Sequence, residues 1–304
     1  MKTKNRVSYQ NDVFFKYALA SDDEKSKYIR HTIIEKLTGI HPVSSKVLNP
    51  GILPKHIDDK MMVLDVHLKD DKGNLYDIEM QSYGSSQSEY RRFLMYGAQS
   101  ITRQLKRGQD YELLKPVYQI IFIDAFAFNN DNLVNTYVFK NQEGMVESDK
   151  PLITRIFIHL PAINHIAKHK TIEEMDEFEL LCYLFKNEGN SAILKSKKGL
   201  VKTIMEKYLE MQEDEQLFTY AEQHTMIQWG IDYQKMEKYE EGMEKGKKQG
   251  KKEATIHLLS QLISKKYDED ASTWLSTLSD EQLSNVSDNL LEAESYEALV
   301  DKIN

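Results

Sequence analysis

The sequence predicts an α/β fold in which helices flank a central mixed β-sheet, followed by a helical C-terminal extension. Three observations predict it. Residues 61–68 and 75–81 alternate like two strands around a turn-rich segment. Residues 89–107 then show a helical period, and residues 116–123 are a nearly continuous β-prone run, which is typical of a buried strand.

The N-terminal region is expected to contain two helices. Asn11 and Asp12 are helix-capping residue types that precede the apolar run at 13–18. Residues 24–37 carry apolar side chains at helical spacing, and Gly39 is expected to end this helix.

Residues 61–81 are expected to form a β-hairpin whose register follows from its side chains. When the segment is folded symmetrically about Lys72, apolar residues face apolar partners on the other strand. A shift by one residue would turn the polar set into the core, so the pattern favours this register. The expected pairs are Leu64 with Met80, Val66 with Ile78 and Leu68 with Tyr76 on one face, and Val63 with Gln81, Asp65 with Glu79 and His67 with Asp77 on the other.

The rest of the chain alternates between strand and helix patterns and then becomes a polar helix. Strands are expected at residues 133–139 and 152–160, and helices within residues 171–211. The change in composition beyond Asp214 predicts an α/β domain at residues 1–230 and a charged helical region at residues 231–304.

Three glycines in the charged region, Gly242, Gly246 and Gly250, recur every four residues and share one helical face. Glycine weakens an isolated helix, so the segment is either a solvated linker of marginal stability or a helix ordered by packing against another surface. In the second case we expect a homodimer through this region, because a twofold dimer is the commonest closed assembly.

Charge and composition exclude several classes of protein. Forty Lys and Arg against 48 Asp and Glu leave a net charge of −8, so any contact with nucleic acid must be local. The single Cys182 excludes an intramolecular disulfide and indicates a reducing compartment. No signal peptide is readable, and the longest apolar run, residues 118–128, is too short for a membrane span. We therefore expect a cytoplasmic protein without membrane contact.

Asp65 and Glu79 would be direct neighbours across the hairpin, where two carboxylates repel each other unless a cation lies between them. Mg²⁺ prefers carboxylate oxygens, and it lowers the pKa of a bound water into a nucleophilic range. Gln81 projects from the same side of its strand, where a polar group could orient the attacking water. The alternative interpretation is an ordinary solvated hairpin face.

The order of several segments along the chain is informative. An acidic residue on one strand, a turn, Glu-x-Gln on the next strand and an amphipathic helix resemble the PD-(D/E)XK nuclease superfamily. The chain also contains, in this order, Asn11-Asp12-Val13-Phe14-Phe15-Lys16-Tyr17, residues 65–81, Arg92-Phe93-Leu94-Met95-Tyr96, and residues 104–111 with 114–117. As a set, these segments are similar to the Rpn (recombination-promoting nuclease) or PD-(D/E)XK nuclease family transposase group.

The resemblance implies a restriction-endonuclease-like fold and a Mg²⁺-dependent endonuclease that acts on DNA in recombination, mobile elements or defence. It assigns Asp65 and Glu79 to the metal, with the main-chain carbonyl of Met80 as a further ligand. Gln81 stands where the superfamily usually has a lysine, and Leu64 stands where it has a proline without a chemical role. Because Gln81 is neutral, it cannot supply the positive charge that would stabilise a developing oxyanion.

Other side chains have weaker support. Glu35 is a candidate for the extra acidic residue that many such nucleases carry on an N-terminal helix. Helix capping explains Asp12, and a satisfied position on the strand explains His67. A basic stripe after the hairpin either holds DNA phosphates or is a solvated helix face; its members are Arg91, Arg92, Arg103, Lys106 and Arg107. The alternative to an enzyme is a nuclease-fold module with little or no activity that binds DNA or a protein partner.

Overall fold

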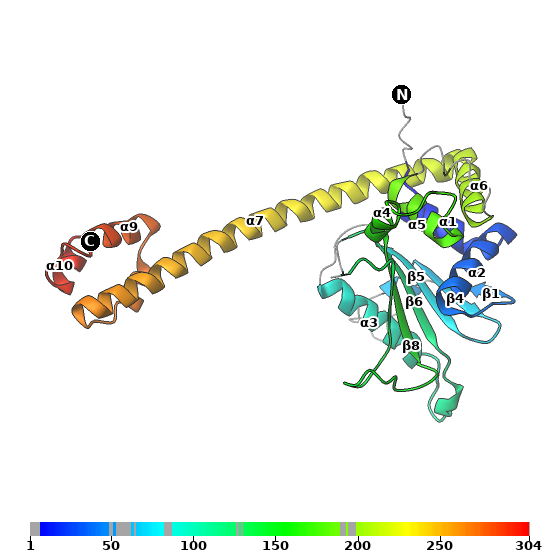
Figure 1. Ribbon diagram of the computed structural model, residues 1–304, viewed down its shortest axis with the longest axis horizontal. Helices are drawn as coiled ribbons and strands as arrows, with labels where there is room; N and C mark the ends of the chain where they lie inside the picture. Colours follow the sequence, from blue (N-terminus) through cyan, green and yellow to red (C-terminus); the bar gives the residue numbers. More distant parts are fainter. Residues whose placement is uncertain are drawn as a thin grey trace. The chain divides into compact units, whose positions relative to one another are not determined.

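The computed structural model describes residues 7–48, 51–52, 62–63, 65–81, 87–125, 128, 130–188, 193 and 199–303. The chain divides into two compact units, Met1–Gln228 and Trp229–Asn304. The first contains a six-stranded sheet among helices, and the described part of the second is helical (Figure 1). The predicted α/β fold with a mixed sheet and a helical C-terminal region is confirmed.

The six-stranded sheet has the order β1-β4-β5-β6-β8-β7. Its strands are β1 (Ser45–Val47), β4 (Val66–Asp70), β5 (Leu75–Gln81), β6 (Val117–Ile123), β7 (Val134–Tyr137) and β8 (Ile153–His159). Strands β5, β6 and β8 pair in parallel, whereas β1, β4 and β7 are antiparallel to their neighbours. The antiparallel hairpin β4-β5 thus adjoins a parallel core. Strands β5 and β6 can pair in parallel because the chain crosses between them through a helix.

The register of the hairpin agrees with the predicted one: Val66 pairs with Ile78, His67 with Asp77 and Leu68 with Tyr76. Its first strand is interrupted, however. The segment β3 (Met62–Val63) pairs with β2 (Gly51–Ile52) in a separate two-stranded sheet, so the expected pairing of Val63 with Gln81 is wrong. The interruption falls at Asp65, which is joined to β5 through side chains: its carboxylate accepts from the Met80 N–H, and its own N–H donates to the Glu79 carboxylate. The expected pair of Leu64 with Met80 lies outside the described residues.

The turn of the hairpin is organised by the buried side chain of Asp70. Its carboxylate accepts hydrogen bonds from the backbone N–H groups of Lys72 and Asn74, the Asn74 amide and the Tyr76 hydroxyl, at 2.8–2.9 Å. Gly73 has a φ of 87°, a conformation that glycine adopts without strain. Because four donors converge on one carboxylate, the length and register of the turn are tightly specified.

The two faces of the hairpin lie in different surroundings. Its apolar side chains join the main core beneath α1 (Asp12–Ala20), α2 (Glu24–Thr38), α5 (Glu177–Asn187) and α6 (Gly199–Glu213). On the opposite face, Ser100 of α3 (Gln87–Thr102) donates a hydrogen bond to Asp77 at 3.3 Å. Three polar side chains of this face are buried: His67, Asp77 and Glu79. The interpretation of an ordinary solvated face is therefore wrong.

Helix α3 is shorter than predicted and presents a different face to the sheet. It ends at Thr102, so Arg103, Lys106 and Arg107 lie beyond it. The side chain of Gln104 bonds to both the N–H and the carbonyl of Lys115, at 2.8 and 2.9 Å, and this contact turns the chain out of the helix.

The face of α3 that packs on the sheet is fixed by one buried polar residue. Gln119 of β6 donates from Nε2 to the carbonyl oxygen of Phe93 at 2.7 Å. Gly97 lies so close that a Cβ there would be 2.8 Å from Gln119 Oε1. Phe93 and Gly97 are therefore buried. Leu94, which the helical period of residues 89–107 places on one face with Tyr90 and Gly97, is instead 43% exposed.

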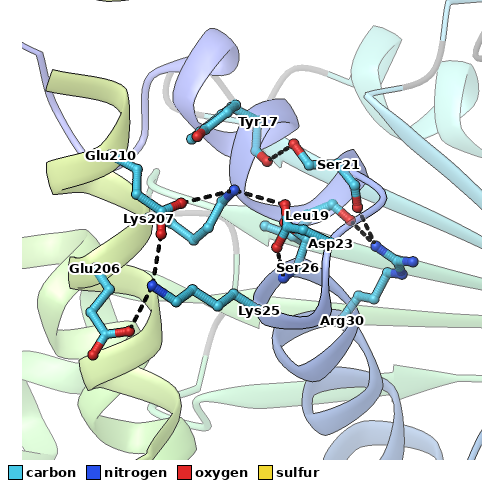
Figure 2. A network of polar contacts seen from close by, with 10 residues as sticks. All are labelled: Tyr17, Leu19, Ser21, Asp23, Lys25, Ser26, Arg30, Glu206, Lys207 and Glu210. Carbon is cyan, nitrogen blue, oxygen red and sulfur yellow. Dashed lines mark hydrogen bonds and ion pairs between the residues drawn. The ribbon is translucent and has the colours of Figure 1, made fainter. Parts of the chain in front are cut away.

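Helix α1 is joined to α2 and α6 by buried cations (Figure 2). Lys207 of α6 is 2% exposed, and its ammonium lies 2.9 Å from Asp23 Oδ2 and 3.3 Å from Glu210 Oε2. It also lies 3.9 Å from the centre of the Tyr17 ring. Arg30 of α2 donates to carbonyl oxygens after and within the last turn of α1, at 2.8 and 3.1 Å. The two carboxylates pair the buried charge of Lys207, and the Arg30 hydrogen bonds satisfy carbonyl groups at the C-terminal end of α1.

The second unit has its own hydrophobic core. Helix α7 (Glu215–Tyr267) extends into it, and the last part of this helix packs with α8 (Ser272–Thr277), α9 (Asp280–Asn289) and α10 (Tyr296–Asp301). Gly242, Gly246 and Gly250 all lie within α7, with no atom within 4 Å of an added Cβ. Among the described residues, no helix has both the length and the apolar character that crossing a membrane requires.

Candidate functional site

Asp65 and Glu79 lie side by side at the end of the hairpin that is remote from its turn. Asp65 Oδ2 accepts a hydrogen bond from the backbone N–H of Met80 at 3.0 Å, and Glu79 Oε1 accepts one from the N–H of Asp65 at 3.3 Å. The backbone of the opposing segment therefore holds each carboxylate. The Asp65 side chain is 14% exposed, and Glu79 is 6% exposed.

Burial and nearby carboxylates both disfavour a negative charge on Glu79. Burial raises the pKa of its carboxyl well above the ordinary value, and the negative charges of Asp65 and Asp77 raise it further. The hydrogen bond from the Asp65 backbone and the charge of Arg92 act in the opposite direction. A cation at this pair of carboxylates would relieve the repulsion.

A lysine of the chain already lies at the pair. Lys16 of α1 places its ammonium 3.2 Å from Asp65 Oδ1, and its side chain is 40% exposed. Burial alone would lower the pKa of Lys16, but Asp65, Asp12 and Glu79 raise it above the ordinary value. The ammonium is therefore charged at neutral pH.

Asp12 brings a further carboxylate close to Asp65. The helix cap is Asn11, whose Oδ1 accepts from two backbone N–H groups of the first turn at 2.9 and 3.1 Å, so capping does not explain Asp12. Burial and the charge of Asp65 raise the pKa of Asp12, whereas Lys16 and His224 lower it. The sequence patterns indicate neither Lys16 nor a role for Asp12 beyond helix capping, although a spacing of four places both on one helical face.

Gln81 is held by an arginine from α3. Arg92 donates from Nη2 to Gln81 Oε1 at 2.8 Å, and its guanidinium carbon lies 5.1 Å from the centre of the Phe93 ring. The guanidinium of Arg92 thus brings a positive charge from α3 to the neutral Gln81 of β5. Arg92 is partly buried, whereas the other members of the predicted basic stripe are exposed: Arg91, Arg103, Lys106 and Arg107.

The remaining candidates have partners of their own. Glu35 binds His41 Nδ1 at 2.8 Å and is 53% exposed. His67 binds Asp77 at 2.5 Å and is buried, which agrees with a satisfied strand histidine.

The oxygen atoms at this end of the hairpin suit a divalent cation that takes few ligands from the protein. Across the described ranges, no group of three or more His, Cys, Asp or Glu side chains is arranged to hold a metal ion. Asp65 and Glu79 nevertheless offer two carboxylates beside the Met80 backbone. Mg²⁺ typically binds one or two carboxylates and completes its shell with water and phosphate oxygens. The residues present therefore fit such an ion.

The comparison with protein families matches residues 9–235 to the model described as PD-(D/E)XK nuclease family transposase. The matched range contains α1, the hairpin and α3. It confirms the resemblance noted in the sequence. Comparisons with curated proteins and with solved structures gave no match.

Proposed function

Because the chain belongs to the PD-(D/E)XK nuclease family transposases, we propose that it is a metal-dependent DNA endonuclease that hydrolyses phosphodiester bonds. The observation that carries this proposal is the pair Asp65 and Glu79, two carboxylates with little exposure that are held together by backbone hydrogen bonds. The family supports a role in mobile elements or recombination, and defence is a further setting for the same reaction.

Asp65 and Glu79, with the main-chain carbonyl of Met80, would hold Mg²⁺ or another divalent cation. When bound, such an ion supplies Lewis acidity that lowers the pKa of a bound water and offsets charge on the phosphate. Gln81 would orient the attacking water, and Arg92 keeps the Gln81 amide in place through the bond at 2.8 Å.

The exposed basic residues on and after α3 would hold the DNA backbone. Arg91, Arg103, Lys106 and Arg107 are all solvent-exposed. Contacts from such side chains to phosphates position DNA without reading its bases. We therefore expect DNA affinity to fall steeply as salt is raised.

The test compares cleavage of supercoiled plasmid by the full-length wild type and by Asp65→Asn and Glu79→Gln, with Mg²⁺ or with a chelator. Each substitution should lower metal-dependent cleavage at least about 100-fold, the scale expected when a group that stabilises the transition state is lost. Glu24→Gln on α2 is the matched control, since its side chain is 92% exposed.

Two further variants in the same assay address the accessory acid. The structure couples Asp12 to Asp65 electrostatically, whereas Glu35 contacts His41. We expect Asp12→Asn to be slower than Glu35→Gln. The opposite order would support the sequence-based assignment of Glu35.

A second candidate function is a weakly active or inactive nuclease-fold module that binds DNA or a protein partner. The neutral Gln81 favours it, because the strand itself lacks the usual cation. Wild type that binds DNA but does not cut it with Mg²⁺ or Mn²⁺ would support this module. Cleavage by both acid variants at the wild-type rate would reject the assigned site.

A further inference from the structure

We propose that Lys16 of α1 is a catalytic residue that supplies to the scissile phosphate the positive charge absent from strand position 81. The inference rests on the proposed nuclease function and extends it to a residue on a different element. The ammonium lies 3.2 Å from Asp65 Oδ1, beside the carboxylates that would hold the metal.

Exposure separates Lys16 from the structural lysine that also packs near α1. Lys207 is 2% exposed, and its ammonium is enclosed by Asp23, Glu210 and the Tyr17 ring. The side chain of Lys16 is 40% exposed. Solvent therefore reaches the side chain of Lys16, whereas that of Lys207 is almost fully enclosed.

The helix that carries Lys16 is held at both ends, so the base of its side chain is well placed. At the N-terminal end, Asn11 Nδ2 donates to the Ala221 carbonyl at 3.2 Å and to Thr225 Oγ1 at 2.9 Å. At the other end, Arg30 binds the last carbonyl groups. The flexible stem of a lysine on such a support can move its charge by several ångströms without moving the helix.

Charge gives the direction of that movement. A divalent cation on Asp65 and the Lys16 ammonium on the same carboxylate would repel each other, since both are positive. The nearest new anion in the complex is the DNA phosphate, and lysine binds phosphate as a point charge. Lys16 would therefore exchange Asp65 for a phosphate oxygen and stabilise the negative charge that develops during hydrolysis.

The experiment uses the full-length chain with Lys16→Met, Lys16→Arg and the control Lys36→Met. Lys36 is a matched control because it is 49% exposed and forms an ion pair with Asp176 at 2.8 Å. Three quantities are measured for each protein: the single-turnover cleavage rate with Mg²⁺, the Kd of Mn²⁺ alone by isothermal titration calorimetry, and the metal-free unfolding temperature.

We expect Lys16→Met to lower the cleavage rate about 100-fold, as for removal of one charge-stabilising group. Its Mn²⁺ affinity should equal or exceed that of the wild type, because a competing cation is gone. Lys16→Arg should recover much of the rate, and Lys36→Met should match the wild type.

Four results would overturn the proposal. Wild-type cleavage by Lys16→Met would exclude a role in the reaction. A loss of Mn²⁺ affinity of about 10-fold or more, or a collapse of the metal-free unfolding temperature, would show that Lys16 positions Asp65 instead. If the wild type itself does not cleave DNA, the proposed function fails first and this inference fails with it.

Discussion

The buried carboxylate of Glu79 is expected to lower the stability of the metal-free protein. Its carboxylate is buried, and Asp65 adds a second negative charge beside it. We expect Glu79→Gln to leave the free energy of unfolding in chelator unchanged or to raise it by about 1 kcal/mol, because the amide keeps the size and removes the charge. Denaturant unfolding at pH 7 measures this. A loss above about 2 kcal/mol would instead indicate a structural role.

The same substitution has a pH dependence of defined sign. The raised pKa of Glu79 means that the folded state binds a proton more tightly than the unfolded chain does. As the pH falls from neutral towards the ordinary Glu pKa, the metal-free wild type loses the penalty of the buried charge. The advantage of Glu79→Gln over the wild type should therefore shrink at pH 5.

The sequence indicated the neighbours Asp65 and Glu79 because alternation along two short strands and a compact turn determine the register. It could not indicate the approach of Lys16 to Asp65 in the same way. These residues belong to different elements, and their contact depends on how α1 packs against the hairpin. No local period relates positions 16 and 65.

At the scale of elements, Gly97 determines how closely α3 can approach the sheet. A Cβ at Gly97 would be 2.8 Å from Gln119 Oε1, so we expect Gly97→Ala to destabilise the protein by about 1–3 kcal/mol through overpacking. Gly246→Ala in α7 is the matched control, since nothing lies within 4 Å of its added Cβ. It should stabilise its helix by up to about 1 kcal/mol. Thermal unfolding of both variants checks the opposite signs; equal signs would contradict the close packing.

The existence and order of α3 could be predicted from the sequence, but its end and its buried face could not. The residues that follow Thr102 are still compatible with a helix. The chain turns there because the Gln104 side chain forms two hydrogen bonds with the Lys115 backbone, and these are tertiary contacts. The buried face follows from Gln119 on the next strand, which must satisfy its amide and does so at Phe93. Periodicity alone placed Leu94 on that face, because it carries no information about a polar partner.

At the scale of the whole molecule, the two units have separate cores, and the second exposes apolar side chains. Leu258, Leu262 and Leu291 are 56%, 42% and 85% exposed. The homodimer through the C-terminal region stays a prediction: full-length protein should be dimeric and a chain ending at Gln234 monomeric in multi-angle light scattering. A monomeric full-length protein at tens of micromolar would contradict it, whatever the shorter chain does.

The turn held by Asp70 constrains the number of residues between β4 and β5 as well as their identity. If an insertion between Asp70 and Leu75 shifted the pairing by one residue, the two faces of β5 would be exchanged relative to β4, and Glu79 would move towards the apolar core and Ile78 towards the site. A substitution that keeps the number of residues in the turn carries no such risk. Insertions and deletions are therefore expected to be tolerated less well in this turn than substitutions at its exposed positions.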